Sequence, residues 1–254
     1  MNGFSVNRSG FFRFIGEQLL GRTRPGEGEL RGLITGMLHD SAAELHGGAV
    51  TCQRCSLFLP VKANPDVPCV DCQGKQLIPE QTIALGDYAV GLGALVAAAK
   101  YGRWALPLDI LGEHLGVELM LELNRCAQPI LVPMPSPFLR RLHRGLFHAG
   151  VIATAVHRVT GWPLASGLWR RWVATQVGAT TSSREKGGGG LKARKGFLKA
   201  IAGREVVLID DVRTSGKSLE RASRFCRRLG AARVSAGIVA TKRPSERTRA
   251  FNPA

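Results

Sequence analysis

Two neighbouring acids followed by small hydroxyl residues form the stretch whose side chains most clearly predict chemistry. Asp210 and Asp211 follow the apolar run 206–209, and the next residues include Thr214, Ser215, Gly216, Lys217 and Ser218. Hydroxyls and backbone N–H groups at the start of a helix suit a phosphate. Two carboxylates beside that phosphate would repel it, so their expected ligands are neutral hydroxyls or a bridging cation. A phosphorylated sugar offers both groups.

A strand, a loop and a helix must position these residues. The run 206–209 is too short for a helix and predicts a buried strand of a parallel sheet, with the acids at its carboxyl end. From Leu219 the chain predicts a helix that Gly230 ends. A Walker A loop is one alternative, although Asp211 stands where its first glycine belongs, and an ordinary strand-to-helix turn is another.

Four cysteines form a second group with chemical meaning. They are Cys52, Cys55, Cys69 and Cys72, two Cys-x-x-Cys pairs separated by thirteen residues. This spacing is typical of tetrahedral thiolate zinc. The segment between the pairs is rich in proline and poor in large apolar residues, so metal binding, about 10–16 kcal/mol, must supply its folding energy. We expect structural zinc, with an iron–sulfur cluster or a redox pair as alternatives.

Further segments predict the rest of an α/β domain. Residues 129–133 indicate a second buried strand, followed by a basic turn with Arg140, Arg141 and Arg144 that suits an anion or is simply solvated. The run 232–241 indicates the last strand. Helical patterns are expected over 94–100 and 104–121. Near the amino terminus, a polar break at 22–29 separates a helical pattern over 11–20 from a short helix over 30–38.

The composition is that of a globular protein with a strong basic excess. The 254 residues carry a formal net charge of +16, with 44% hydrophobic and 21% charged residues. Such an excess favours polyanionic partners without choosing between nucleic acid, acidic membrane and phosphorylated substrate. The longest apolar run, 89–99, is too short to span a bilayer, and no signal peptide pattern opens the chain. We therefore expect a cytoplasmic protein.

The paired acids and hydroxyl-rich loop resemble the type I phosphoribosyltransferases, and the preceding cysteine pairs with Lys100-Tyr101 narrow the resemblance to the ComF (ComFC-type) family. The resemblance implies a parallel-sheet α/β domain of that type behind a small zinc-binding domain. It implies that Asp210 and Asp211 hold the ribose hydroxyls of phosphoribosyl pyrophosphate, that residues 214–218 hold its 5-phosphate, and that Mg²⁺ accompanies the ligand. The basic turn with Arg140 and Arg144 joins the substrate site.

The same resemblance divides the chain and names its partners. We expect a helical extension over 1–47, a four-cysteine zinc-binding domain over 48–78, the phosphoribosyltransferase-like domain over 79–243 and a basic tail over 244–254. The family is linked to natural DNA uptake. Two departures from its pattern, Leu146-Phe147-His148 and the four glycines 187–190, bear on turnover. The alternative is therefore a non-catalytic accessory protein that binds single-stranded DNA or a DNA-uptake helicase.

Overall fold

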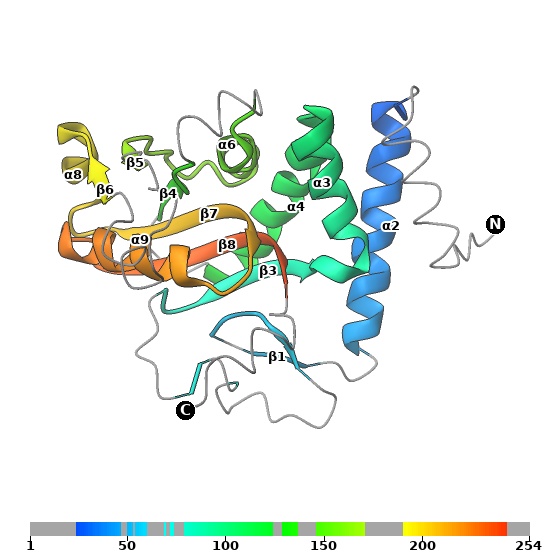
Figure 1. Ribbon diagram of the computed structural model, residues 1–254, viewed down its shortest axis with the longest axis horizontal. Helices are drawn as coiled ribbons and strands as arrows, with labels where there is room; N and C mark the ends of the chain where they lie inside the picture. The colour runs from blue at the N-terminus through cyan, green and yellow to red at the C-terminus, as the bar shows by residue number, and fades with distance from the viewer. Residues whose placement is uncertain are drawn as a thin grey trace, which may run out of the picture.

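A sheet of four parallel strands forms the centre of the computed structural model, in the order β3-β8-β7-β4 (Figure 1). The structure describes residues 24–46, 50–52, 54–59, 69, 72–73, 79–123, 129–136, 146–170 and 190–242. The strands are β3 (Thr82–Asp87), β4 (Ile130–Pro133), β7 (Glu205–Arg213) and β8 (Arg233–Thr241). The predicted α/β class with a parallel sheet is confirmed.

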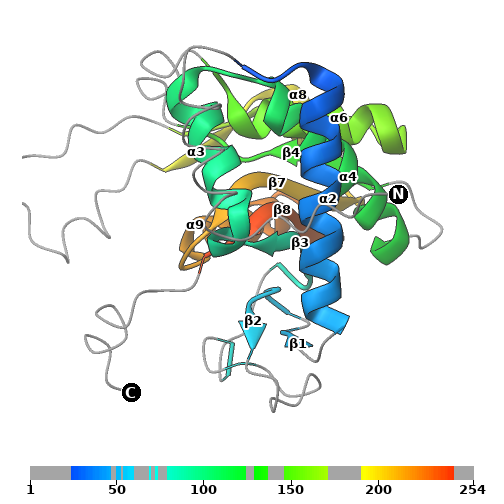
Figure 2. The same ribbon diagram turned by 90° about the vertical axis from the view of Figure 1, so that its right-hand side faces the viewer.

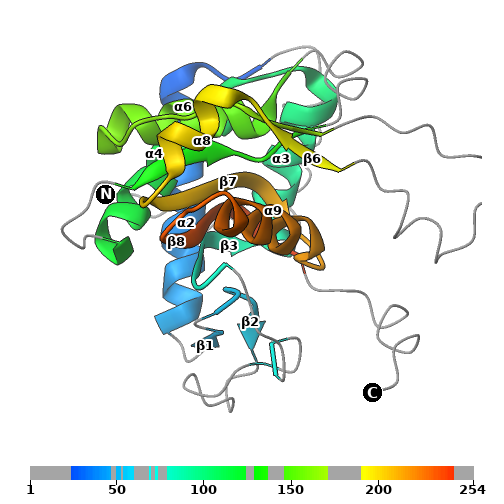
Figure 3. The same cartoon turned by 90° about the vertical axis from the view of Figure 1, so that its left-hand side faces the viewer.

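Helices cover both faces of this sheet. One face carries α3 (Gly93–Gly102), α4 (Leu106–Leu123) and α6 (His148–Thr160), and the other carries α8 (Lys195–Ile201) and α9 (Lys217–Arg228) (Figures 1 and 3). Side chains of β7 alternate between the two cores: Val207 and Ile209 pack on the first, Val206 and Leu208 on the second. Burial on both faces explains the unbroken apolar run.

The strand and helix predicted around the acids are present. Strand β7 nevertheless continues past both acids to Arg213, because its pairing with β8 persists from Asp210 opposite Ile238 to Arg213 opposite Thr241. The following helix, α9, ends close to Gly230, whose φ of 97° lies in the left-handed region that glycine tolerates. The acids therefore lie on the last part of a paired strand rather than beyond it.

Helix α2 (Glu27–His46) differs from its expected bounds at both ends. It begins inside the predicted polar break, because Glu27 and Glu29 favour the positive amino end of a helix and Glu27 pairs with Arg31 one turn later. Leu30 and Ile34 are fully buried in the core that α2 shares with α4. Figure 2 shows α2 beside α4. The pattern over 11–20 lies outside the described residues.

The cysteine-bearing segment lies beside the edge strand β3, as the three views agree (Figures 1 to 3). Its short strands β1 (Val50–Thr51) and β2 (Phe58–Leu59) pair antiparallel. Ser56 joins the segment to the sheet, since its hydroxyl donates to the Thr82 carbonyl and its own carbonyl accepts from Thr241 Oγ1 at 3.2 Å. The remaining elements are the π-helical turn η1 (Tyr88–Leu92) and the hairpin of β5 (Leu168–Arg170) and β6 (Leu191–Ala193).

Candidate functional site

Asp211 is held by two basic side chains from different elements. Lys100 Nζ of α3 lies 2.9 Å from Asp211 Oδ2, and His148 Nδ1, from the first residue of α6, lies 3.5 Å from the same oxygen. Burial acts to raise the pKa of Asp211, but His148 and Lys100 outweigh it and bring the pKa below its ordinary value. The Asp211 carboxylate is therefore kept charged, with one oxygen engaged inside the protein.

Asp210, in contrast, lies in an environment that disfavours its charged form. Burial and the charge of Asp211 raise its pKa to about 7, although the Asp211 backbone N–H donates to Asp210 Oδ1 at 2.9 Å. The two adjacent carboxyl groups thus differ in charge preference because Lys100 and His148 contact Asp211 directly, whereas the Lys100 charge lowers the pKa of Asp210 less than burial and Asp211 raise it. Neighbouring titratable groups whose pKa values are driven apart are frequent in functional sites.

The loop after β7 presents exposed polar groups at the start of α9. Thr214, Ser215, Lys217 and Ser218 are exposed. Gly216 adopts a φ of 72° as the cap residue of α9 and offers no capping side chain, so N–H groups of the first turn are available to an external acceptor. Residues 214–218 therefore lie together beside the acids.

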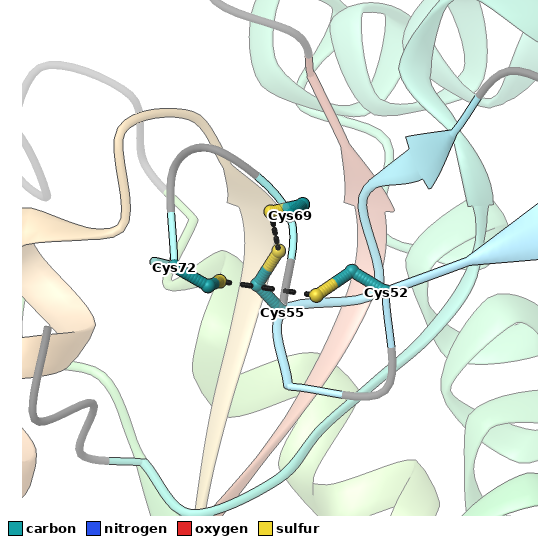
Figure 4. A group of neighbouring side chains, drawn as sticks. All are labelled: Cys52, Cys55, Cys69 and Cys72. Carbon is teal, nitrogen blue, oxygen red and sulfur yellow. Dashed lines mark hydrogen bonds between the residues drawn. The ribbon is translucent and has the colours of Figure 1, made fainter. Parts of the chain in front are cut away.

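The four cysteines converge on one point, as Figure 4 shows. All four are buried, and their sulfur atoms lie within 4.8 Å of one another. Cys52 and Cys72 sulfurs are 3.9 Å apart, and Cys55 and Cys69 sulfurs 3.6 Å apart. Zinc–sulfur bonds of about 2.3 Å in a tetrahedron place sulfurs about 3.8 Å apart. This donor set therefore fits a metal such as zinc.

Backbone hydrogen bonds shape the two Cys-x-x-Cys pairs, and neighbouring groups shift the pKa values of their thiols. The Ser56 and Gln73 backbone N–H groups donate to the carbonyls of Cys52 and Cys69, which folds each pair into a tight turn. The Cys72 thiol, with the charge of Arg213 contributing, lowers the pKa of Cys55 to about 5, whereas burial raises the pKa of Cys69 to about 11. Metal binding would accordingly release protons from the remaining thiols.

Other predicted residues lie outside the described part of the chain. These are Arg140, Arg141, Arg144 and the glycines 187–189. The sequence analysis missed the roles of three residues that the structure brings to the end of β7. In the sequence, Lys100 belongs only to a family resemblance and His148 to a departure from it, and no pattern singles out Arg213. His148 Nε2 is buried and has no hydrogen-bond partner among the described residues.

A hollow elsewhere on the described surface is another candidate binding site. It has a volume of about 540 Å³ and lies between α4, α6 and Leu164. Its wall is almost wholly apolar and includes neither acid and none of residues 214–218. The hollow therefore does not combine the groups that a phosphorylated sugar requires.

Comparison with known proteins relates the carboxyl-terminal part of the chain to a known domain. A model of the phosphoribosyl transferase domain matches residues 158–252, the stretch that contains β7, the acids and α9. Over these residues the chain is similar to a phosphoribosyl transferase domain. A curated relative, the DNA utilization protein YhgH of Salmonella typhi, is 25% identical over 196 residues, which cover 72% of this chain and 80% of that protein. With the four cysteines ahead of the domain, this distant homologue supports the predicted resemblance.

Some solved structures with limited similarity to this chain are also of proteins named for phosphoribosyl compounds. Glutamine phosphoribosylpyrophosphate amidotransferase from B. subtilis is 21% identical with a TM-score of 0.37, and covers 52% of this chain. The match spans 25% of the amidotransferase, about a quarter of its length. Purine phosphoribosyltransferase from Pyrococcus horikoshii is 14% identical with a TM-score of 0.34, over 54% of this chain and 81% of that one. The fold class of the phosphoribosyl transferase domain rests on its own strand order.

No helix within the described residues has the length and apolar character needed to cross a membrane.

Proposed function

We propose that this protein binds phosphoribosyl pyrophosphate together with Mg²⁺ at the end of β7. The observation that carries the proposal is the placement of Asp210 and Asp211 beside residues 214–218 at the open start of α9. The carboxylates accept hydrogen bonds from the ribose hydroxyls, and the loop N–H groups and hydroxyls donate to the 5-phosphate. The matched phosphoribosyl transferase domain supports this assignment.

The proposed reaction is transfer of the phosphoribosyl group with loss of pyrophosphate. The bond from the anomeric carbon to the pyrophosphate oxygen breaks while the acceptor forms its bond to the same carbon. Mg²⁺ supplies charge neutralisation of the leaving pyrophosphate. The contribution of the chain is positional: Lys100 and His148 orient Asp211, and the loop fixes the phosphate end of the sugar. Arg140 and Arg144 join the anion site in this proposal.

We also propose that the cysteine cluster holds structural zinc. Four thiolates fill a tetrahedral site and leave no open position for catalysis. Reduced cysteines in metal-binding spacing are typical of a cytoplasmic protein, which is the location we propose. The division of the chain at residues 47, 78 and 243 belongs to the same proposal.

Calorimetric titration of the zinc-loaded protein with phosphoribosyl pyrophosphate and Mg²⁺ tests the ligand site. Wild-type protein should bind. The Asp210→Asn, Asp211→Asn double variant keeps the shape of both side chains but loses their charge, and hydrogen bonds to charged groups contribute about 1.5–3 kcal/mol each. Its affinity should fall at least about tenfold. Wild-type protein that fails to bind, or a folded double variant that binds equally well, contradicts the proposal.

The second candidate is a non-catalytic accessory that binds single-stranded DNA or a DNA-uptake helicase. The observation in its favour is the basic outer face of α9, where Lys217, Arg221, Arg224 and Arg228 are exposed. Such a face can follow a phosphate backbone without reading sequence. The distant relative is named a DNA utilization protein, which agrees with a partner of this class. Binding that falls steeply with salt and ignores sequence distinguishes this candidate.

A further inference from the structure

Arg213 is a buried cation that the proposed chemistry does not use. It is the last residue of β7, two positions after Asp211, and only 8% of it is exposed. Arginine is almost never buried unless its charge is paired, because removing a guanidinium from water is costly. The groups around Arg213 therefore indicate which anion its charge serves.

The two neighbouring acids do not pair with Arg213. Asp211 pairs with Lys100 and His148, and Asp210 accepts from the backbone N–H of Asp211. The guanidinium makes no hydrogen bond or ion pair with any residue that the structure describes. The charge of Arg213 is thus not consumed by the acids of the site.

The guanidinium lies against the loop that begins α9. A Cβ added to Gly216 would lie 3.2 Å from both Nε and Nη2 of Arg213 and 3.5 Å from its Cζ. The planar group therefore lies in the space that a side chain at position 216 would fill. Gly216 is also the cap residue of α9, has a φ of 72° and leaves the first N–H groups of this helix open. A charged donor and open helix N–H groups thus meet at one turn.

These donors suit the oxygens of a phosphate. The positive end of α9 favours negative charge, and a guanidinium can donate to two phosphate oxygens at once. The loop contains a second cation, Lys217, but its side chain is exposed and its charge is screened by water and salt. Arg213 is shielded from water, so its attraction for an anion is stronger.

We propose that Arg213 is a ligand of the 5-phosphate and donates to it from within the protein. The loop N–H groups and hydroxyls donate to the same phosphate from the other side. The absence of a Cβ at Gly216 leaves the guanidinium its place in the loop. A sugar without the phosphate lacks this contact, so Arg213 makes the site selective for phosphorylated sugars. This assignment rests on the function proposed above.

Calorimetric titration of the intact zinc-loaded protein with ribose 5-phosphate isolates the phosphate contact, because this compound carries no pyrophosphate. Wild-type protein should bind it more tightly than ribose. Arg213→Met keeps the apolar stem and removes the charge. Its affinity for ribose 5-phosphate, and for phosphoribosyl pyrophosphate with Mg²⁺, should fall at least about 10-fold, the effect of losing a hydrogen bond to a charged group.

Matched variants separate this contact from a general loss of positive charge. Arg233→Met makes the same change at the amino end of β8, where Arg233 pairs with Glu80 on the surface, and should bind both ligands as wild type does. Arg213→Lys keeps the charge but lacks the planar fork, so its affinity should lie between those of wild type and Arg213→Met. Lys217→Met should weaken binding less than Arg213→Met, because Lys217 is exposed.

Urea unfolding and zinc content separate phosphate binding from a purely structural role. The charge of Arg213 also acts on Cys55, so a structural role would be to support the cysteine cluster. If Arg213 serves the phosphate, Arg213→Met without ligand should retain zinc and be at least as stable as wild type, because the substitution removes an unpaired buried charge. A variant that loses zinc and stability together with ligand affinity would overturn the proposal.

The remaining outcomes distinguish this inference from the proposed function. If wild-type protein binds phosphoribosyl pyrophosphate and folded Arg213→Met binds it equally well, the role of Arg213 is wrong and the ligand site stands. If wild-type protein binds ribose 5-phosphate through Arg213 but does not bind phosphoribosyl pyrophosphate with Mg²⁺, the phosphate contact stands and the proposed function fails. If wild-type protein binds neither compound, both are wrong.

Discussion

The two adjacent acids should affect stability in opposite directions when each is replaced by asparagine. Asp210 has a raised pKa, so its favourable contribution is complete below the ordinary value of 3.8 and is lost as the pH rises through about 7. Asp211 has a lowered pKa, so its contribution is present at neutral pH and is lost as the pH falls through that lowered pKa. At pH 8, Asp210→Asn should stabilise the protein and Asp211→Asn should destabilise it.

The magnitude follows from the environment of each carboxyl group. The rise in the pKa of Asp210 from 3.8 to about 7 corresponds to an upper limit of about 4 kcal/mol at pH 8. The gain in the free energy of unfolding should be smaller, about 1–2 kcal/mol. The two neighbouring acids titrate as a pair, and burying the asparagine amide also costs free energy of solvation. Asp211→Asn leaves Lys100 without its charged partner, which should cost about 1.5–3 kcal/mol.

Urea unfolding of wild-type protein and both variants at pH 5 and pH 8 measures these effects. The advantage of Asp210→Asn should be larger at pH 8, because ionised Asp210 opposes folding there and the asparagine does not. The Asp211→Asn variant serves as the matched control, since it changes the same atoms one residue away. Equal destabilisation by both substitutions, or a pH-independent effect of Asp210→Asn, would refute our account of how the two environments differ.

Three further expectations can be checked separately. Gly216→Ala should weaken phosphoribosyl pyrophosphate binding in calorimetry, because φ at this position is 72° and an L side chain there is strained by about 1–2 kcal/mol; Gly190→Ala, at an exposed position without close contacts, is the control. Elemental analysis should find about one zinc per chain and a loss of zinc in Cys55→Ser; absence of zinc from freshly reduced wild type would contradict the proposed metal. Single-stranded DNA affinity, if the second candidate is right, should fall steeply with salt, and salt-independent binding would count against it.

The sequence predicted the elements whose side chains face both cores. The apolar run before Asp210 and the run 232–241 became neighbouring parallel strands, because burial on both faces demands continuous apolar residues. The cysteine spacing likewise predicted a cluster, since each Cys-x-x-Cys turn is local. Helix α6 was missed, although it buries Ile152 and Val156 and begins next to the acids. Its small-residue pattern lacks a capping side chain at the start.

The partners of the acids could not be predicted because they come from distant parts of the chain. Lys100 precedes Asp211 by more than a hundred residues and reaches it only because α3 packs beside the end of β7. His148 appeared in the sequence as a departure from a family pattern, and nothing local indicated that its Nδ1 would face a carboxylate. No local pattern singles out Arg213, which continues the ladder with β8 opposite Thr241.

These contacts assign different tasks to the two acids. Asp211 already has two basic partners on Oδ2, so a ligand adds little to its stabilisation. Asp210 makes no ion pair among the described residues. Hydroxyl groups of a ribose would donate hydrogen bonds to the Asp210 carboxylate, which burial separates from water. Ligand binding should therefore lower the pKa of Asp210 and relieve the unfavourable free energy that its charge imposes at neutral pH. The acid that destabilises the empty site is, on this reasoning, the one that contributes most to holding the sugar.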